Sequence, residues 1–128
     1  MNICIVFSTR PEIIKLSPII QKLKENNSKY YLINTNQHTL KRMSKVFLDF
    51  FKIDGNLYNI KSIKNSQSAF LANAIKEVDK ILKKKKPNFL IVQGDTNTSL
   101  AGCLAASLIN RNLPLKRKIK IIHIESGL

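Results

Sequence analysis

The sequence is poor in cysteine and glycine, and each shortage narrows what the chain could be. The 128 residues include only two cysteines, Cys4 and Cys103, which lie far apart within apolar runs. Neither has the spacing of metal ligands, so we expect buried, reduced thiols and no metal site. The four glycines form no GxGxxG sequence, which excludes the nucleotide-binding fingerprint that needs a glycine-rich loop.

Long apolar runs are also missing. The run Ile3–Phe7 is too short for the core of a signal peptide, and no small-residue cleavage site follows it. The longest uncharged apolar stretch, Leu100–Ile109, is too short to cross a bilayer. We therefore expect a soluble, cytoplasmic protein.

Acidic residues are scarce, since eight Asp and Glu stand against 22 Lys and Arg, a formal net charge of +14. Such an excess is typical of proteins that bind nucleic acid or acidic membranes. Lys, Ile and Asn number 18, 18 and 13 against only 4 Arg, and these three have AT-rich codons, so nucleotide bias explains the charge. No nucleic-acid motif accompanies it, so we expect neither nucleic acid nor membrane as a partner. Salt-dependent polyanion binding through Lys83–Lys86 and Leu115–Lys120 is an alternative.

What the sequence does contain is an alternation of strands and helices in one domain's length of chain. This order predicts an α/β fold with a Rossmann-like parallel sheet and helices on both faces. Pro18 should bend or split the first helix, and Asn36 could take a left-handed turn. The predicted strands are Asn2–Phe7, Tyr30–Thr35, Leu57–Ile60, Phe89–Val92 and Ile119–Ile124. A first helix should begin after Thr9, and the other predicted helices are Met43–Phe51, Ser66–Lys86 and Asn97–Arg111.

Charged clusters follow three of these strands: Ser8–Glu12, Gln93–Thr96 and His123–Gly127. The carboxyl ends of parallel strands lie at one edge of the sheet, where ligands of such folds bind. We therefore expect these clusters to meet in one site.

The first cluster favours a phosphate. Arg10 and Lys15 lie about one turn apart at the start of a helix, where unpaired N–H groups and the helix dipole attract anions. Alternatively, both cations pair only with Glu12 or with solvent. Gln37 and His38 follow the second strand and reach the same edge.

The other two clusters supply carboxylates. Asp95 and Glu125 could divide into an acid and a base if their surroundings separate their pKa values. Alternatively, Asp95 or Thr96 is only the N-cap of the next helix. His123 alternates with Glu125 along the strand and should share its face, where we expect a packed core histidine.

Four stretches together resemble the UDP-N-acetylglucosamine 2-epimerases. They occur in the order found in that family and cover essentially this whole chain, but only the N-terminal domain of the family. The stretches are Ser8–Pro18, Asn34–His38, Val92–Thr98 and His123–Leu128.

The resemblance implies one half of a two-domain GT-B fold, with the site in the cleft between the halves. It implies interconversion of UDP-GlcNAc and UDP-ManNAc without a nicotinamide cofactor, by elimination and re-addition of UDP. Some bacterial relatives instead hydrolyse the sugar nucleotide or act on other UDP-N-acetyl sugars.

The resemblance also implies roles for individual residues. Asp95 and Glu125 match the carboxylates assigned to proton transfer. Arg10 and Lys15 match residues near the UDP-sugar. Gln37 and His38 match positions that in some bacterial members help to hold an activating second UDP-GlcNAc.

Residues 1–128 would then be a truncated N-terminal domain, with the C-terminal UDP-binding domain absent. We therefore predict negligible epimerase activity from this chain alone. The alternatives are a split-enzyme subunit or an interaction module that pairs with a separate C-terminal half. We expect a UDP-sugar as substrate, and a homodimer or that separate half as protein partner.

Overall fold

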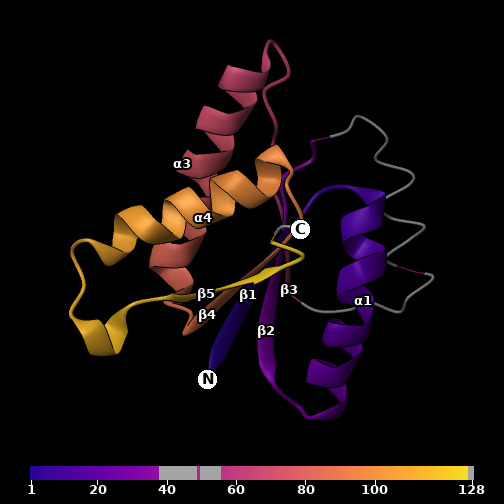
Figure 1. The fold of residues 1–128 in the computed structure, drawn as a ribbon, viewed down its shortest axis with the longest axis vertical. Coiled ribbons are helices and arrows are strands. Elements are labelled where there is room, and N and C mark those ends of the chain that lie inside the picture. Colours follow the sequence, from indigo (N-terminus) through magenta and orange to yellow (C-terminus); the bar gives the residue numbers. More distant parts are fainter. Residues whose placement is uncertain (38–48, 50–55, 127–128) are drawn as a thin grey trace.

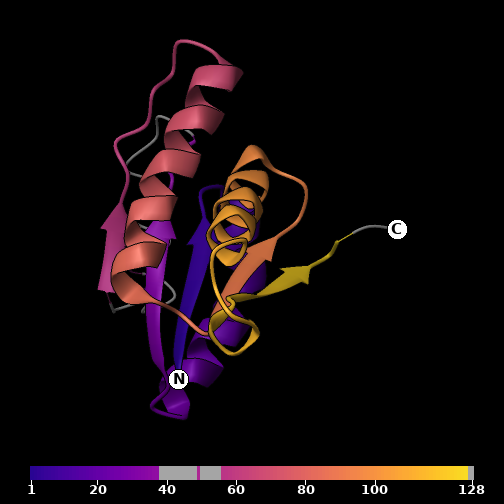
Figure 2. The same ribbon diagram turned by 90° about the vertical axis from the view of Figure 1, so that its left-hand side faces the viewer.

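A computed structural model describes residues 1–37, 49 and 56–126 of the chain. Five parallel strands form one sheet in the order β3-β2-β1-β4-β5, shown in Figures 1 and 2. This confirms the predicted parallel α/β sheet. The strands are β1 (Asn2–Phe7), β2 (Lys29–Asn34), β3 (Asn56–Asn59), β4 (Phe89–Gln93) and β5 (Lys120–Ile124).

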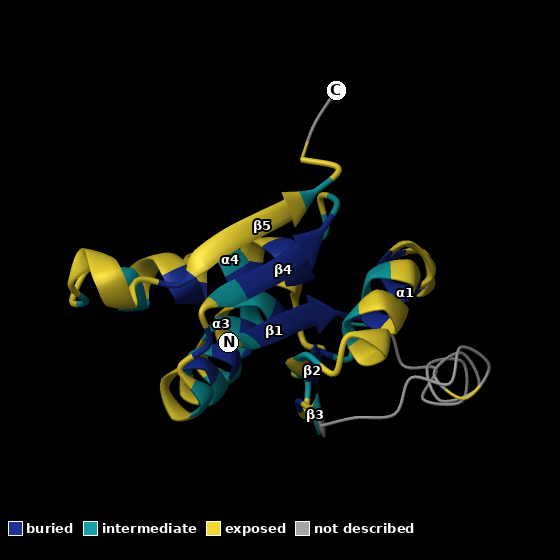
Figure 3. Cartoon of the chain, turned by 90° about the horizontal axis from the view of Figure 1, so that it is seen from below, coloured by how far each residue is buried: buried dark blue, intermediate teal, exposed yellow. Residues whose placement is uncertain are grey.

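Helices cover both faces of the sheet, as predicted. Helix α1 (Arg10–Glu25) lies on one face, and α3 (Gln67–Lys85) and α4 (Asn97–Asn110) lie together on the other (Figure 3). A short 3-10 turn, Leu115–Arg117, lies in the basic connection before β5. The helix predicted over Met43–Phe51 falls outside the described residues, apart from position 49.

The central strands are buried on both faces because their side chains alternate between two cores. In β1, Cys4 and Val6 join the core under α3 and α4, whereas Ile5 and Phe7 join the core under α1. This continuous burial explains why β1 reads as an unbroken apolar run.

Two local predictions concern Pro18 and Asn36, and the structure differs from the first and agrees with the second. Helix α1 continues through Pro18 to Glu25, so the proline does not split it. Asn36 takes the predicted left-handed conformation, with φ 54°. Its side chain donates to the backbone oxygen of Ile60 over 2.7 Å, which fixes this turn against the end of β3.

Helix α4 approaches the sheet closely because its buried face is built from small residues: Ala101, Gly102, Ala105 and Ala106. A Cβ atom at Gly102 would lie 3.0 Å from Cγ1 of Val92 in β4. The predicted close packing of this helix is confirmed, and the absence of a side chain at Gly102 permits it.

The two cysteines differ from expectation in one respect. Both thiols are free, but only Cys4 is buried, whereas Cys103 is partly exposed. Burial raises the pKa of Cys4 to about 12, and burial also raises the pKa of Cys103. Both thiols are therefore poor nucleophiles at neutral pH.

The contact between α4 and β4 predicts the result of enlarging residue 102. We expect Gly102→Val to lower the free energy of unfolding by about 1–3 kcal/mol, because its side chain must displace Val92. Denaturant unfolding followed by circular dichroism measures this. Ser107→Val, at an exposed position of the same helix, controls for helix propensity. Equal effects from both variants would contradict the packing argument.

Candidate active site

Pairing of β1 with β4 brings the first two polar clusters together at the carboxyl edge of the sheet. Ile5 is paired with Ile91, so the loop after Phe7 lies beside the turn after Gln93. Pairing of β4 with β5 adds the third cluster, because Gln93 is opposite Ile124. The prediction that the three clusters share one edge is confirmed.

Glu12 joins the first two clusters and is 1 % exposed. Its Oε2 accepts hydrogen bonds from the backbone N–H groups of Ser8 at 2.9 Å and Thr9 at 2.6 Å. Its Oε1 accepts one from the Thr96 hydroxyl at 2.6 Å. Three donors offset the cost of burying this carboxylate.

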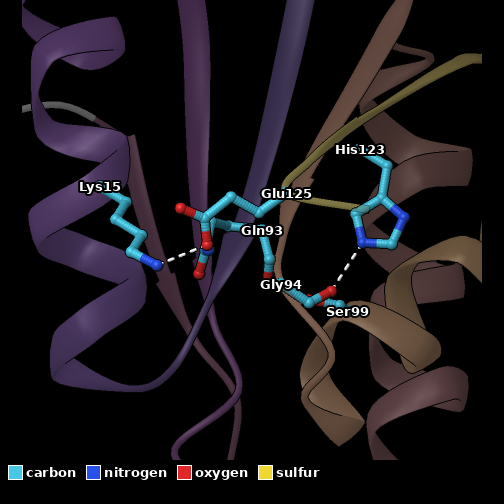
Figure 4. A network of polar contacts seen from close by, with 6 residues as sticks. All are labelled: Lys15, Gln93, Gly94, Ser99, His123 and Glu125. Atoms are coloured by element: carbon cyan, nitrogen blue, oxygen red, sulfur yellow. Dashed lines mark hydrogen bonds and ion pairs between the residues drawn. The ribbon is translucent and has the colours of Figure 1, made fainter. Parts of the chain in front are cut away.

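Lys15 and Glu125 form an ion pair between α1 and the end of β5 (Figure 4). Gln93 Nε2 also donates to Glu125 Oε2 over 3.0 Å. Both charged side chains are about half exposed, so the pair contributes little to stability and stays open to a ligand. Lys15 is thus paired with Glu125, not with Glu12 or solvent alone, whereas Arg10 is the exposed first residue of α1.

His123 and Glu125 do not share a face, contrary to prediction. Glu125 takes φ 56°, a left-handed conformation that ends the alternation of the strand. Figure 4 shows its side chain directed toward Lys15, and His123 on the side of Gly94. His123 is exposed, not a core residue, and its Nε2 donates to the Gly94 backbone oxygen at 2.6 Å.

Asp95 does not cap α4, because Thr96 does so. The Thr96 hydroxyl accepts from the backbone N–H of Ser99 at 3.2 Å. Asp95 is exposed and follows Gly94, whose φ of 72° makes the tight turn. The N-cap explanation therefore accounts for Thr96 and leaves Asp95 facing solvent at the site edge.

Gln37 is held by a chain of hydroxyl groups. The Thr98 hydroxyl donates to Gln37 Oε1 at 3.0 Å and lies 2.8 Å from that of Thr35. The Gln37 backbone N–H donates to Ser8 Oγ. Because Oε1 is occupied, the amide N–H groups of Gln37 are the part offered to a ligand. His38 lies outside the described residues.

A cleft of about 630 Å³ opens beside this edge. It is lined by Gln37, the segment from Ile63 to Phe70 around the start of α3, and the turn at Asp95, Thr96 and Asn97. A volume of this order suits a small molecule. Among the residues that the structure describes, no group of His, Cys, Asp and Glu could hold a metal ion, and no helix could span a membrane.

The sequence motifs identified the charged residues but not their supports. Gln93, Thr96 and Thr98 orient the charged and amide groups. The sequence indicates Thr96 only as a possible cap, and the sequence signal for Glu12 is the Thr-x-x-Glu pattern of a capping box. Its contact with Thr96 spans 84 positions and has no local signal.

Comparison with known proteins decides the family. The model of the UDP-N-acetylglucosamine 2-epimerase family matches residues 21–128. The chain belongs to this family. A UDP-N-acetylglucosamine 2-epimerase of Methanocaldococcus jannaschii is 41% identical over 128 residues, and that of Methanococcus maripaludis is 44% identical over 127.

Solved structures agree. The M. jannaschii UDP-GlcNAc 2-epimerase in complex with UDP-GlcNAc and UDP matches with a TM-score of 0.87 and 40% identity, over 100% of this chain and 33% of that one. The enzyme of Neisseria meningitidis bound to UDP-GlcNAc matches at 0.83 and 31% identity, over 100% of this chain and 33% of that one. These matches confirm the predicted Rossmann-like part of a GT-B fold.

The chain spans about a third of the length of these relatives. It covers 33% of the M. jannaschii protein and 32% of the M. maripaludis protein, with 100% and 99% of this chain aligned.

The buried hydrogen bond between Thr35 and Thr98 generates a prediction about stability. Thr98→Val should lower the free energy of unfolding by about 1–3 kcal/mol, because it leaves the buried Thr35 hydroxyl without a partner. Thr35→Val/Thr98→Val should recover part of this loss, since no buried hydroxyl remains. Denaturant unfolding of the three proteins tests this, and a double variant less stable than Thr98→Val would contradict it.

Proposed function

We propose that this chain supplies the acid/base wall of a UDP-N-acetylglucosamine 2-epimerase site, as the N-terminal Rossmann-like domain of a two-domain enzyme. The proposal is supported by the shared edge, to which strand pairing brings the segments of the charged residues, by the ion pair of Lys15 with Glu125, and by the cleft that Gln37 and Asp95 line. Relatives that span three times this length are named as that enzyme, and one solved relative holds UDP-GlcNAc and UDP.

In this proposal the start of α1 receives the diphosphate. Arg10 and Lys15, from the first two turns of α1, supply positive charge to the leaving UDP. Lys15 is already paired with Glu125, so an arriving phosphate competes for its ammonium group and releases the Glu125 carboxylate. Substrate binding and availability of the carboxylate are thereby coupled.

Asp95 and Glu125 then move the C2 proton. That proton is weakly acidic, so its removal needs a placed carboxylate together with departure of UDP. The reaction is elimination of UDP across C1 and C2, followed by re-addition with protonation at the opposite face. We assign no nicotinamide cofactor and no metal to it.

Gln37 and His38 complete the binding side of the proposal. The Gln37 amide N–H groups lie at the cleft and suit the oxygen-rich surface of a sugar nucleotide. The sugar itself varies among relatives. A Pseudomonas aeruginosa protein, 30% identical, is named a UDP-2,3-diacetamido-2,3-dideoxy-D-glucuronate 2-epimerase. UDP-GlcNAc is the substrate we propose here, in a cytoplasmic enzyme.

A second candidate, pairing with a separate C-terminal half, is favoured by β5. This strand lies at the edge of the sheet (Figure 2) and is coloured mainly as exposed in Figure 3. Its Ile121 and Ile122 are 36% and 42% exposed. Neighbouring strand residues point to opposite faces, so both faces of β5 are open. An apolar strand of a parallel sheet is normally covered, which favours another polypeptide segment here.

The decisive assay compares the chain alone with the chain joined to the C-terminal two thirds of the M. jannaschii relative. We expect no conversion of UDP-GlcNAc to UDP-ManNAc by the chain alone, because a cleft with only one of its two walls admits water freely. The joined protein should convert it, and Asp95→Asn or Glu125→Gln should lower the rate by about 10²-fold or more. Proton NMR follows both sugar nucleotides.

Two results would contradict the proposal. One is full activity of both carboxamide variants in the joined protein. The other is measurable conversion by residues 1–128 alone, which would overturn the division of the site. Asp79→Asn, on the outer part of α3 and paired with Lys83, is the matched control.

A further inference from the structure

Glu12 takes no part in the chemistry proposed above, yet it is the most buried carboxylate among the described residues. It is 1 % exposed, whereas Asp95 and Glu125 are exposed. A buried carboxylate is costly unless every lone pair that faces protein finds a donor. Here the three donors come from two separate segments of chain.

The two segments are those that carry the site. Ser8 and Thr9, which donate to Oε2, directly precede Arg10. Thr96, which donates to Oε1, directly follows Asp95. One carboxylate therefore joins the loop of the proposed phosphate cations to the turn of the proposed acid/base residue.

A local role explains only half of this arrangement. The bond from Thr9 belongs to a capping box, which stabilises the start of α1, and the bond from Ser8 comes from the residue just before it. The bond from Thr96 lies outside that motif. The Thr96 hydroxyl caps α4 as an acceptor from Ser99, and this leaves its single proton free for Glu12.

We propose that Glu12 and Thr96 are positioning residues, whose hydrogen bond fixes the loop of Arg10 relative to the turn of Asp95. This inference rests on the proposed function of the same edge. A shift of one segment against the other would move the phosphate contacts away from the proton-transfer group, and such misplacement is costly in a site of this kind.

We call the hydrogen bond between Glu12 and Thr96 the junction. Four variants of the chain separate it from the role of Thr96 as the N-cap of α4. Thr96→Ser keeps both bonds of the hydroxyl. Thr96→Asp keeps a good N-cap but sets a second carboxylate against Glu12. Glu12→Gln alone keeps an oxygen for Ser8 and Thr9. Glu12→Gln/Thr96→Asp restores the junction with reversed polarity, because the new amide donates to the new carboxylate.

Two readouts apply. The first is amide hydrogen exchange of Ser8 and Thr9 in the 128-residue chain, measured by NMR. The second is the affinity for UDP-GlcNAc of the same variants joined to the C-terminal two thirds of the M. jannaschii relative, measured by isothermal titration calorimetry. We expect Thr96→Asp to speed the exchange and weaken the affinity, each by about tenfold, as loss of a charge-assisted hydrogen bond implies. In Thr96→Ser and in the double variant, the exchange rates and the affinity should both be close to those of the wild type.

Recovery in the double variant is the outcome that a purely local role would not produce. Exchange at Ser8 and Thr9 unchanged in Thr96→Asp would overturn the junction. Loss of affinity without recovery in the double variant would overturn its role in positioning. Absence of UDP-GlcNAc binding by the wild-type joined protein would instead overturn the proposed function, and with it the purpose of the junction.

Discussion

Parallel pairing of β1 with β4 is the interaction on which the site depends. These strands are separated by more than 80 residues, yet their register sets Ser8–Glu12 directly beside Gln93–Thr96. Helix α4 must then lie close to the sheet for Thr96 and Thr98 to reach across, and Gly102 allows this approach. The polar edge is therefore a product of the packing of the core.

Most of the fold could be predicted because it is written in local patterns. Apolar runs give the strands, three- and four-residue spacing gives the helices, and Asn36 gives a left-handed turn. The errors were also local in origin. Strand alternation placed His123 with Glu125, but the positive φ of Glu125 ends that alternation.

The candidate site was predictable at the level of its charged groups and not of its contacts. Residues at the carboxyl ends of strands could be placed at one edge by a general rule. Which of them touch could not, because Lys15 and Glu125 are 110 positions apart and Glu12 and Thr96 are 84 apart. Such pairs depend on the tilt of α1 and α4 against the sheet, and no short motif encodes it.

Part of the positive charge of the chain lies away from the candidate site. Several lysines at the amino edge of the sheet have structural partners. The Lys85 ammonium lies 4.6 Å from the centre of the Tyr31 ring and 5.3 Å from that of Tyr58, and a hydrogen bond with Tyr58 raises the pKa of Lys85. Lys83 pairs with Asp79. These contacts agree with a solvated basic surface more than with a polyanion site.

The most direct test of the account is a map of backbone amide shifts during titration with UDP-GlcNAc at moderate salt. We predict shifts at the carboxyl edge, in Ser8–Lys15, Gln37, Gly94–Thr98 and Glu125. Shifts confined to the basic amino edge, in Lys83–Lys86 and Lys116–Lys120, would contradict it, because the ligand would then be held by charge alone.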